Sequence, residues 1–529
     1  MANGYLSFVL HAHLPFVRHP EYDQFLEELW FFEAITETYI PLLQRFEALD
    51  EESVPWGLTI SISPSLLAML EDELLRARYQ RRMKVLVELC EREQERLKGD
   101  PHFKYLAGWY HDYFKNCLDY FEACNGRLST KFKALHERGN LEVISCVGTH
   151  GFMPHLAAIP KTMEGQLENG FAYFESVMGF KANGAWLPEC AYYPGLDERL
   201  RDYGIRFFCT ESSGIEYSNP APVYGVHAPL FTPSGVAAFG RDHACTKQVW
   251  SAEAGFPGDG DYREFYRDIG HELDFDYLKP FLPGDVRSDT GIKYHRITGP
   301  GYNKAGYDPE SARKKADQHA AQFLSQRVSH IDYLKSTMGV APVIVAPFDA
   351  ELFGHWWFEG PTWLDYVLRK AAYDQSSLET ISLGKYLDRN PVHQTAYPVT
   401  SSWGHKGHFE YWLNGENDWM LDQLTACGWR MVELANSFNQ KKTVKKLNDR
   451  ALKQCARELV LAQSSDWPFI VSNGTSQQYA ERRVRDHCSR FHYLASALTE
   501  DTVDAKELET LELMDNIFPD INWRVYAEN

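Results

Sequence analysis

Paired cysteines are missing from this 529-residue chain. Its ten cysteines are scattered, and none forms a CxxC pair or a short metal-ligand spacing. This pattern excludes a small zinc module and a disulfide scaffold, and it favours free thiols in a reducing compartment. We therefore expect a cytoplasmic protein.

A basic excess and long apolar runs are missing as well. Lys and Arg number 54 against 73 Asp and Glu, and the net charge of −19 would repel a phosphate backbone. The start, "MANGYLSFVLHAH", lacks a basic segment followed by an apolar core and a cleavage site, and no window approaches ~18 uncharged apolar residues. We expect no nucleic-acid partner and no membrane partner.

Aromatic residues, by contrast, are plentiful at 14% of the chain. Flat rings are good platforms for the C–H faces of sugars. A large aromatic-rich core would use the same residues, and composition alone does not separate the two interpretations.

Alternating strand and helix patterns organise most of the chain. Residues 5–10, "YLSFVL", are β-branched and aromatic, and residues 23–46 then carry apolar side chains at helical spacing. Further strand patterns lie at 58–63, 141–150, 184–189, 205–212, 341–351 and 378–387. About seven strands separated by helices predict an α/β fold with a parallel sheet closed into a barrel.

Two stretches depart from this alternation. Residues 219–306 are rich in Gly, Pro and aromatics, which is typical of a functional loop or insertion. From about residue 398 the pattern becomes mostly helical. We therefore predict a catalytic barrel over 1–397 with an insertion at 219–306, and a helical domain over 398–529 that contributes to the cleft.

Polar side chains follow several of these strands, where a parallel barrel places its catalytic groups. They are His11, His13, Ser63, His150, Glu189, Glu211 and Asp349. Two facing carboxyl groups can cleave or transfer a glycosidic bond, and a separation of roughly 5 Å would retain anomeric configuration. The alternatives are that Glu189 pairs with an arginine in the core and that Asp349 caps a helix.

Three histidines leave the kind of site open. His11 and His13 alternate by two along an extended chain, so both can point the same way. With His150 they would suit a metal site or hydrogen bonds to sugar hydroxyls. His150 could equally be a satisfied polar group in a loop.

Five motifs in order resemble those of glycoside hydrolase family 57. They are "HAHLP" (11–15), "GTHGFMP" (148–154), "WLPECAY" (186–192), "APFDAELFGHWWFEG" (346–360) and "SSWGHKGHFEYWLN" (401–414). The match extends to "SSDWPFIVSNGTSQQYAERR" (464–483) and covers nearly the whole chain. Within the family, the sequence most resembles the α-1,4-glucan branching enzymes.

The resemblance implies a distorted (β/α)7 barrel and a retaining mechanism without metal or cofactor. Glu189 would be the nucleophile and Asp349 the general acid/base. The implied substrate contacts are His11, His13, His150, Trp186, His355, Trp403, Trp412 and Asp466. The substrate would be an α-1,4-glucan, cut and transferred to a 6-hydroxyl by a monomer or small homo-oligomer.

The chain also departs from this family pattern. Branching relatives close a tyrosine-bearing loop over the cleft, yet no tyrosine lies between Tyr224 and Tyr262, so Phe231 or Phe239 would have to cover the site. His271 stands where relatives tend to have an aromatic that stacks on substrate. These differences leave open an amylase-type hydrolase or a 4-α-glucanotransferase, which linkage analysis of the product distinguishes.

Two more distant alternatives also remain. A metal-dependent polysaccharide deacetylase would share the barrel and the paired histidines, and chelation would abolish its activity. An idle glycan-binding protein would bind amylose without turnover.

Overall fold

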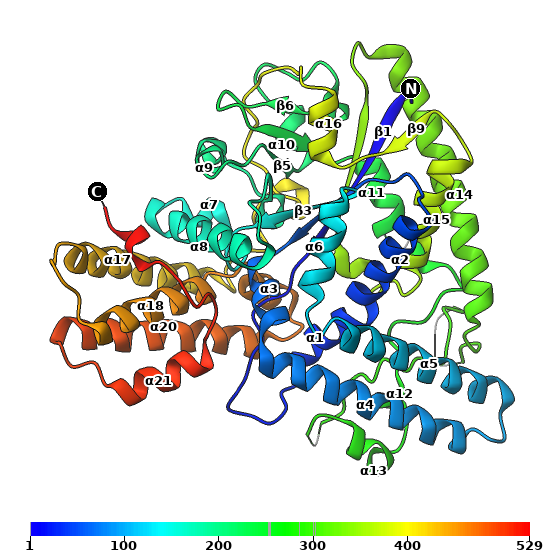
Figure 1. Cartoon of the computed structure of the whole chain (residues 1–529), viewed down its shortest axis with the longest axis horizontal. Helices are drawn as coiled ribbons and strands as arrows, with labels where there is room; N and C mark the ends of the chain where they lie inside the picture. The colour runs from blue at the N-terminus through cyan, green and yellow to red at the C-terminus, as the bar shows by residue number, and fades with distance from the viewer. Residues whose placement is uncertain (1, 252–254, 285, 300, 302, 529) are drawn as a thin grey trace.

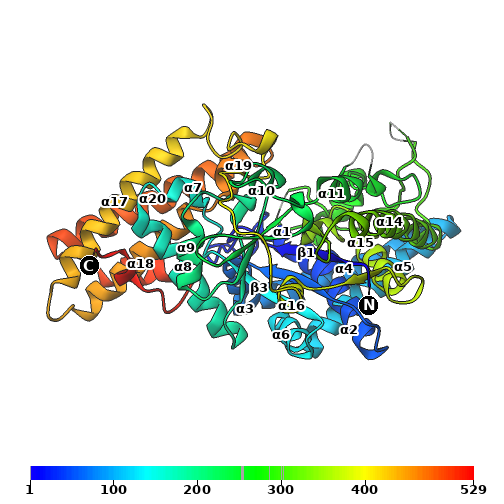
Figure 2. The same cartoon turned by 90° about the horizontal axis from the view of Figure 1, so that it is seen from above.

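The computed structural model describes residues 2–251, 255–284, 286–299, 301 and 303–528. A mixed strand-and-helix body and a group of C-terminal helices lie side by side in both views (Figures 1 and 2). The two chain ends lie far apart, one on each of these parts.

A curled, almost entirely parallel sheet forms the centre of the larger part. Its parallel strands in spatial order are β7 (Ala237–Gly240), β5 (Phe207–Thr210), β4 (Gly184–Trp186), β3 (Leu141–Cys146), β2 (Leu58–Ile62), β1 (Gly4–Ala12) and β8 (Val343–Asp349). Just past β7, the Asp242 backbone N–H donates to the Val345 carbonyl of β8 at 2.9 Å, which brings the two ends of this order together. The predicted (β/α)7 barrel is confirmed.

Helices cover the outside of this sheet. They include α2 (Ile40–Glu51), α6 (Leu128–Arg138), α8 (Pro160–Met178), α14 (Pro309–Thr337), α15 (Gly360–Tyr373) and α16 (Leu383–Arg389). The long helices α4 (Glu73–Arg96) and α5 (Pro101–Ala123) pack against each other and extend away from the barrel (Figure 1). Shorter helices are α1 (Glu28–Glu33), α3 (Pro64–Glu71), α7 (Met153–Leu156), α9 (Leu196–Asp202), α10 (Ser212–Glu216), α11 (His243–Trp250), α12 (Ile269–Glu272) and α13 (Phe275–Leu278).

The strands are apolar and buried because helices cover the outer face of the barrel and side chains of the strands fill its inner face. All five residues of β2 are buried, and the chain then turns at once into α3. Ser63 caps this helix by accepting from the Leu66 backbone N–H, and Pro64 occupies its first position, which lacks a donor anyway.

Two strands were not predicted, and their position corrects an expectation. The short β6 (Leu230–Phe231) and β7 form an antiparallel hairpin, and β7 then runs parallel to β5. The hairpin turn therefore lies at the amino-terminal end of the barrel, near Arg206, opposite the end where His11 and Asp349 lie. Phe239 is 1% exposed inside the core.

The turn of this hairpin, residues 232–236, thus cannot close over the catalytic end, and the expectation that Phe231 or Phe239 covers the site is wrong. The strand "VAAFG" is short and preceded by Gly and Pro, so its pattern resembled a loop. The last predicted strand is real but short: β9 (Leu378–Thr380) pairs with the first three residues of β1.

The chain after residue 400 is helical, as predicted. It contains α17 (Asp418–Asn439), α18 (Lys446–Ala462), α19 (Asp466–Asn473), α20 (Gln477–Glu500) and α21 (Ala505–Met514). Backbone hydrogen bonds join this part to barrel loops, for example from Ser465 N–H to the His150 carbonyl at 3.0 Å. The exact boundary at 397/398 stays a prediction. Among the described residues, no helix combines the length and apolar character needed to cross a membrane.

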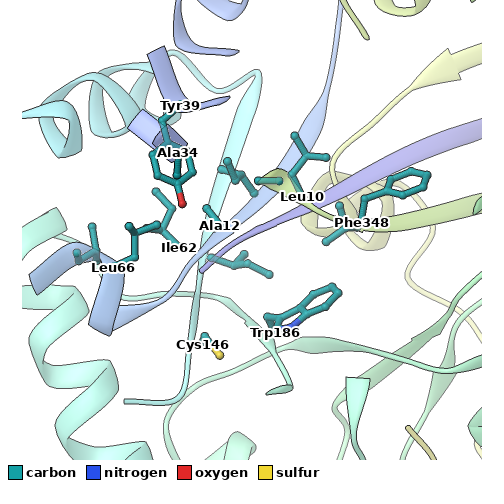
Figure 3. Close-up of a cluster of buried hydrophobic side chains, with 14 of the residues drawn as sticks. Leu10, Ala12, Ala34, Tyr39, Ile62, Leu66, Cys146, Trp186 and Phe348 are labelled. Carbon is teal, nitrogen blue, oxygen red and sulfur yellow. The ribbon is translucent and has the colours of Figure 1, made fainter. Parts of the chain in front are cut away.

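A buried core lies at the carboxyl ends of the strands. Figure 3 shows Ala12 and Ile62 near the ends of β1 and β2, with Ala34 and Tyr39 of a neighbouring helix beside them. Trp186 lies on the other side of β1. All ten cysteines are free and buried, as expected for reduced thiols.

Candidate active site

Strand register places several predicted residues at one level of the barrel. His11 on β1 pairs with Asp349 on β8 and with Ser61 on β2. Because all three strands run parallel, these residues lie at the carboxyl end, where a barrel carries its catalytic groups.

Glu189 lies in a tight turn just after β4. Its backbone is in the left-handed region, with φ 62° and ψ 23°, which is uncommon for a residue with a side chain and typical of functional sites. Its two carboxylate oxygens accept separate hydrogen bonds, from the Trp403 indole N–H at 2.8 Å and from the Ser465 hydroxyl at 2.8 Å. Burial raises the pKa of Glu189 to about 7, while these two donors act in the opposite direction.

Asp349 ends β8 in a different setting. It is exposed to solvent, and its side chain makes no hydrogen bond to any other described residue. Burial first, and then the charge of Glu189, raise its pKa to about 7. The two carboxyl groups are therefore close enough to repel each other.

The different surroundings of Glu189 and Asp349 assign them different protonation states. Because the two carboxyl groups interact, the titration of each depends on the charge of the other. Two hydrogen-bond donors favour the ionised form of Glu189. Asp349 has no such donor among the described residues, and only the charges of His13 and Arg241 favour its ionisation. An anionic Glu189 beside a protonated Asp349 can act as nucleophile and general acid.

The three predicted histidines form one cluster. Each Nδ1 atom contacts a serine hydroxyl, at 3.2 Å for His11 with Ser61, 2.8 Å for His13 with Ser63 and 2.7 Å for His150 with Ser465. Their Nε2 atoms point inward. The Nε2 atoms of His11 and His150 lie 3.0 Å apart, and that of His13 lies 2.9 Å from Asp466 Oδ2.

The cluster combines neutral histidines with an anion. Burial lowers the pKa of His11 and His150 well below its usual range. For Asp466, burial opposes ionisation, but His13 outweighs it and the pKa falls to about 2. Ligand atoms of His13, His150 and Asp466 lie within 4.8 Å of one another, so the geometry accommodates either sugar hydroxyls or a metal ion.

The predicted tryptophans differ in exposure. Trp186 is fully buried and stacks on the His11 ring at 4.6 Å, so it packs against the histidine cluster from the side of the core. Trp403 is partly exposed and packs edge-on against Trp186. Trp412 is 2% exposed and stacks on Phe152 at 4.7 Å.

His355 has a separate set of partners. Its Nδ1 lies 3.0 Å from Glu37 Oε2, and no hydrogen bond joins it to Glu189 or Asp349 in the described part of the chain. The next residue, Trp356, is 58% exposed and stacks on Phe265 at 4.7 Å. A substrate contact by His355 stays a prediction. His271 is an exposed partner of Asp289 at 2.9 Å.

Several residues of the site were not predicted. Ser465 contacts both Glu189 and His150, and Glu351 accepts a hydrogen bond from the His13 backbone N–H at 3.2 Å. Ser465 and Glu351 lie inside motifs that were recognised, but their types gave no sign of these contacts. Tertiary packing alone brings Ser465 and Glu351 to the candidate active site.

The model of glycosyl hydrolase family 57 matches residues 7–397. The chain belongs to this family. A second model, for the C-terminal region of 1,4-alpha-glucan branching enzymes, matches residues 423–526.

Individual relatives of this family 57 chain include branching enzymes and an alpha-amylase. It is 35% identical to the 1,4-alpha-glucan branching enzyme TK1436 of Thermococcus kodakarensis, over 97% of this chain and 77% of that protein. Among solved structures, the alpha-amylase AmyC from Thermotoga maritima is 41% identical with a TM-score of 0.93, covering all of both chains. The GH57-type branching enzyme from Pyrococcus horikoshii is 34% identical with a TM-score of 0.89, covering 100% of this chain and 97% of that one.

Replacing Ser465 with alanine is expected to shift the acid limb of the kcat/KM profile to higher pH. The serine hydroxyl favours ionised Glu189, so its loss raises the pKa of that carboxyl, by roughly one unit for a hydrogen bond to a charged group. Ser472→Ala on the same helix is the control, because Ser472 donates to the Tyr411 carbonyl instead. Equal profiles for both variants would contradict the assignment.

Proposed function

We propose that this family 57 enzyme is a 1,4-α-glucan branching enzyme. It cuts an α-1,4 bond, holds the fragment as a covalent glycosyl-enzyme and passes it to a glucan 6-hydroxyl. The observation that carries the proposal is the Glu189–Asp349 pair, completed by Trp403 and by Ser465, of which Ser465 lies in the C-terminal part that matches the branching-enzyme model.

The chemistry follows from the two carboxyl groups. Glu189 attacks the anomeric carbon while Asp349 gives its proton to the departing glycosidic oxygen. The Asp349 carboxylate then takes the proton of the acceptor hydroxyl, whose oxygen displaces Glu189 from the anomeric carbon. Two displacements at the same carbon retain the anomeric configuration, and this step sequence needs no metal or cofactor.

The histidine cluster is proposed to bind the sugar next to the bond that breaks. Neutral His11 and His150 and anionic Asp466 can donate to and accept from hydroxyl groups. His355 and Trp412 would contact sugars further along the chain. The proposal extends to an α-glucan partner, a role in glycogen synthesis and a cytoplasmic location.

Hydrolysis is the second candidate, and one observation favours it. The hairpin turn at residues 232–236 lies at the far end of the barrel, so it does not shield the glycosyl-enzyme from water. Water exclusion decides between transfer and hydrolysis. A relative titled as an alpha-amylase is also 41% identical to this chain.

Incubation with amylose distinguishes the two. We expect new α-1,6 linkages to outnumber new reducing ends, as measured by linkage analysis and a reducing-sugar assay on the same samples. Reducing ends without branches would make the enzyme a hydrolase. Glucans of new chain length, formed without new α-1,6 linkages and without new reducing ends, would make it a 4-α-glucanotransferase.

A further inference from the structure

An unusual helical turn packs against the segment that follows Asp349. The π-helix η1 (Ala34–Tyr39) joins α1 to α2 without a break in the helical backbone. Such turns make up well under 1% of residues in globular proteins and occur often at functional sites. All six residues are buried, including the polar Glu37 and Tyr39 at 5% and 0% exposure.

The local sequence does not favour a regular helix here. "AITETY" contains one isoleucine and two threonines, whose branched β-carbons lower helix propensity. Contacts with other elements must therefore hold the π-turn in place. Figure 3 shows Ala34 and Tyr39 facing the core beside Ala12 and Ile62, with the Tyr39 hydroxyl pointing inward.

Three consecutive residues of η1 contact the segment 351–355. The Tyr39 hydroxyl donates to Glu351 Oε1, and Glu37 Oε2 bonds His355 Nδ1 at 3.0 Å. Thr38 Oγ1 accepts from the His355 backbone N–H at 3.3 Å. The segment thus has hydrogen bonds to η1 at both ends, beginning two residues after Asp349.

Backbone packing tightens this contact. Gly354 has φ 124°, and a Cβ atom there would lie 1.8 Å from the Glu37 carbonyl oxygen. Only glycine permits such an approach. Glu351 also accepts from the His13 backbone N–H at 3.2 Å, so the same carboxyl joins η1 to the end of β1.

The charge of Glu37 fixes the other end of the segment. Arg263 Nη2 lies 2.7 Å from Glu37 Oε1, and both side chains are buried. Burial opposes ionisation of Glu37, but Arg263 and His355 outweigh it and lower its pKa to about 2. An ionised Glu37 accepts the Nδ1–H of His355 and fixes the orientation of that ring.

We propose that η1 positions the general acid/base, with Tyr39 and Glu37 holding residues 349–355 so that the Asp349 carboxyl stays aimed at the glycosidic oxygen. Neither side chain contacts Asp349 itself, so both are positioning residues. The inference rests on the proposed role of Asp349 and holds whether the acceptor is a glucan or water.

Tyr39→Phe tests this proposal, because it removes one hydroxyl and keeps the ring. We expect kcat for total α-1,4 cleavage to fall roughly tenfold or more with little change in KM, since small misplacements of a reacting group are costly. The basic limb of the pH profile should stay in place. Glu351, with a pKa raised to about 8, already holds its proton when Asp349, with a pKa of about 7, loses its own.

Tyr113→Phe is the matched control. The Tyr113 hydroxyl donates to the Thr36 carbonyl of the same π-helix at 2.8 Å but touches nothing in the segment 349–355. It should lower the melting temperature by a similar amount while leaving kcat and the pH profile unchanged. Glu37→Gln is the second variant, and it should lower kcat/KM roughly five- to tenfold, because a neutral amide weakens the charge-assisted hydrogen bonds to His355 and Arg263.

Unchanged kcat in folded Tyr39→Phe would overturn the proposal and leave η1 a purely structural element. So would equal effects of Tyr39→Phe and Tyr113→Phe. Failure of the proposed catalytic roles is a separate result, because Asp349→Asn would then retain activity. Because total cleavage is measured, the outcome does not depend on how branching and hydrolysis are balanced.

Discussion

Glu189→Gln is expected to lower the rate of α-1,4 cleavage by roughly 10⁴-fold or more, the scale seen when a covalent nucleophile is removed. The amide has nearly the same shape and can still contact Trp403 and Ser465, but it cannot form the glycosyl-enzyme. New reducing ends and new α-1,6 linkages should fall together, because both come from that one intermediate. Both are measured with amylose over long incubations.

Glu142→Gln is the control for this variant. Glu142 is also a buried barrel carboxyl whose pKa is raised by burial, but it accepts from Thr59 and from the Gly384 backbone N–H, near the start of its strand. Its replacement should leave turnover unchanged. Substantial activity in Glu189→Gln would remove the central assignment.

Asp349→Asn is expected to show the second-largest loss, roughly 10²- to 10⁴-fold on amylose, the range that general acid–base catalysis contributes. Asparagine cannot give a proton to the glycosidic oxygen. An aryl maltooligosaccharide with a 4-nitrophenolate leaving group needs no such proton, so its first cleavage step should be much less affected. Pre-steady-state release of 4-nitrophenol measures that step.

Adding azide distinguishes the loss of a general base from damage to the fold. It needs no deprotonation, so it should restore turnover in Asp349→Asn and give a glycosyl azide of retained configuration. Asp365→Asn is the control, because Asp365 is buried on α15 and pairs with Arg369 at 2.9 Å, away from the site. No gain with azide and equal losses on both substrates would contradict a general acid/base role.

The residues at the ends of strands could be predicted from the sequence. Apolar runs that stop on His11, Glu189 or Asp349 mark side chains leaving the core, and the fold brings these residues to one end of the barrel. The prediction failed at β7, where "VAAFG" is too short and too close to Gly and Pro to show alternation. That failure left the hairpin of β6 and β7 unpredicted, and with it the positions of Phe231 and Phe239.

The supporting residues could not be predicted in the same way. Ser465 and Tyr39 reach the site only through tertiary packing, from segments with no strand-end signal. A serine in a helix-rich region and a tyrosine in a helix pattern have many ordinary roles. Their function depends on which carboxylate they face, and that information lies in the fold.

The bond between His13 and Asp466 joins positions 453 residues apart in the chain. At a synthesis rate of roughly 5–20 residues per second, the two partners leave the ribosome roughly 20 to 90 s apart. The barrel strands and both carboxyl groups of the proposed catalytic pair are made first, but Ser465 and Asp466 are not yet present to complete their surroundings. We therefore expect the growing chain to act on glucan only after the C-terminal helices have docked.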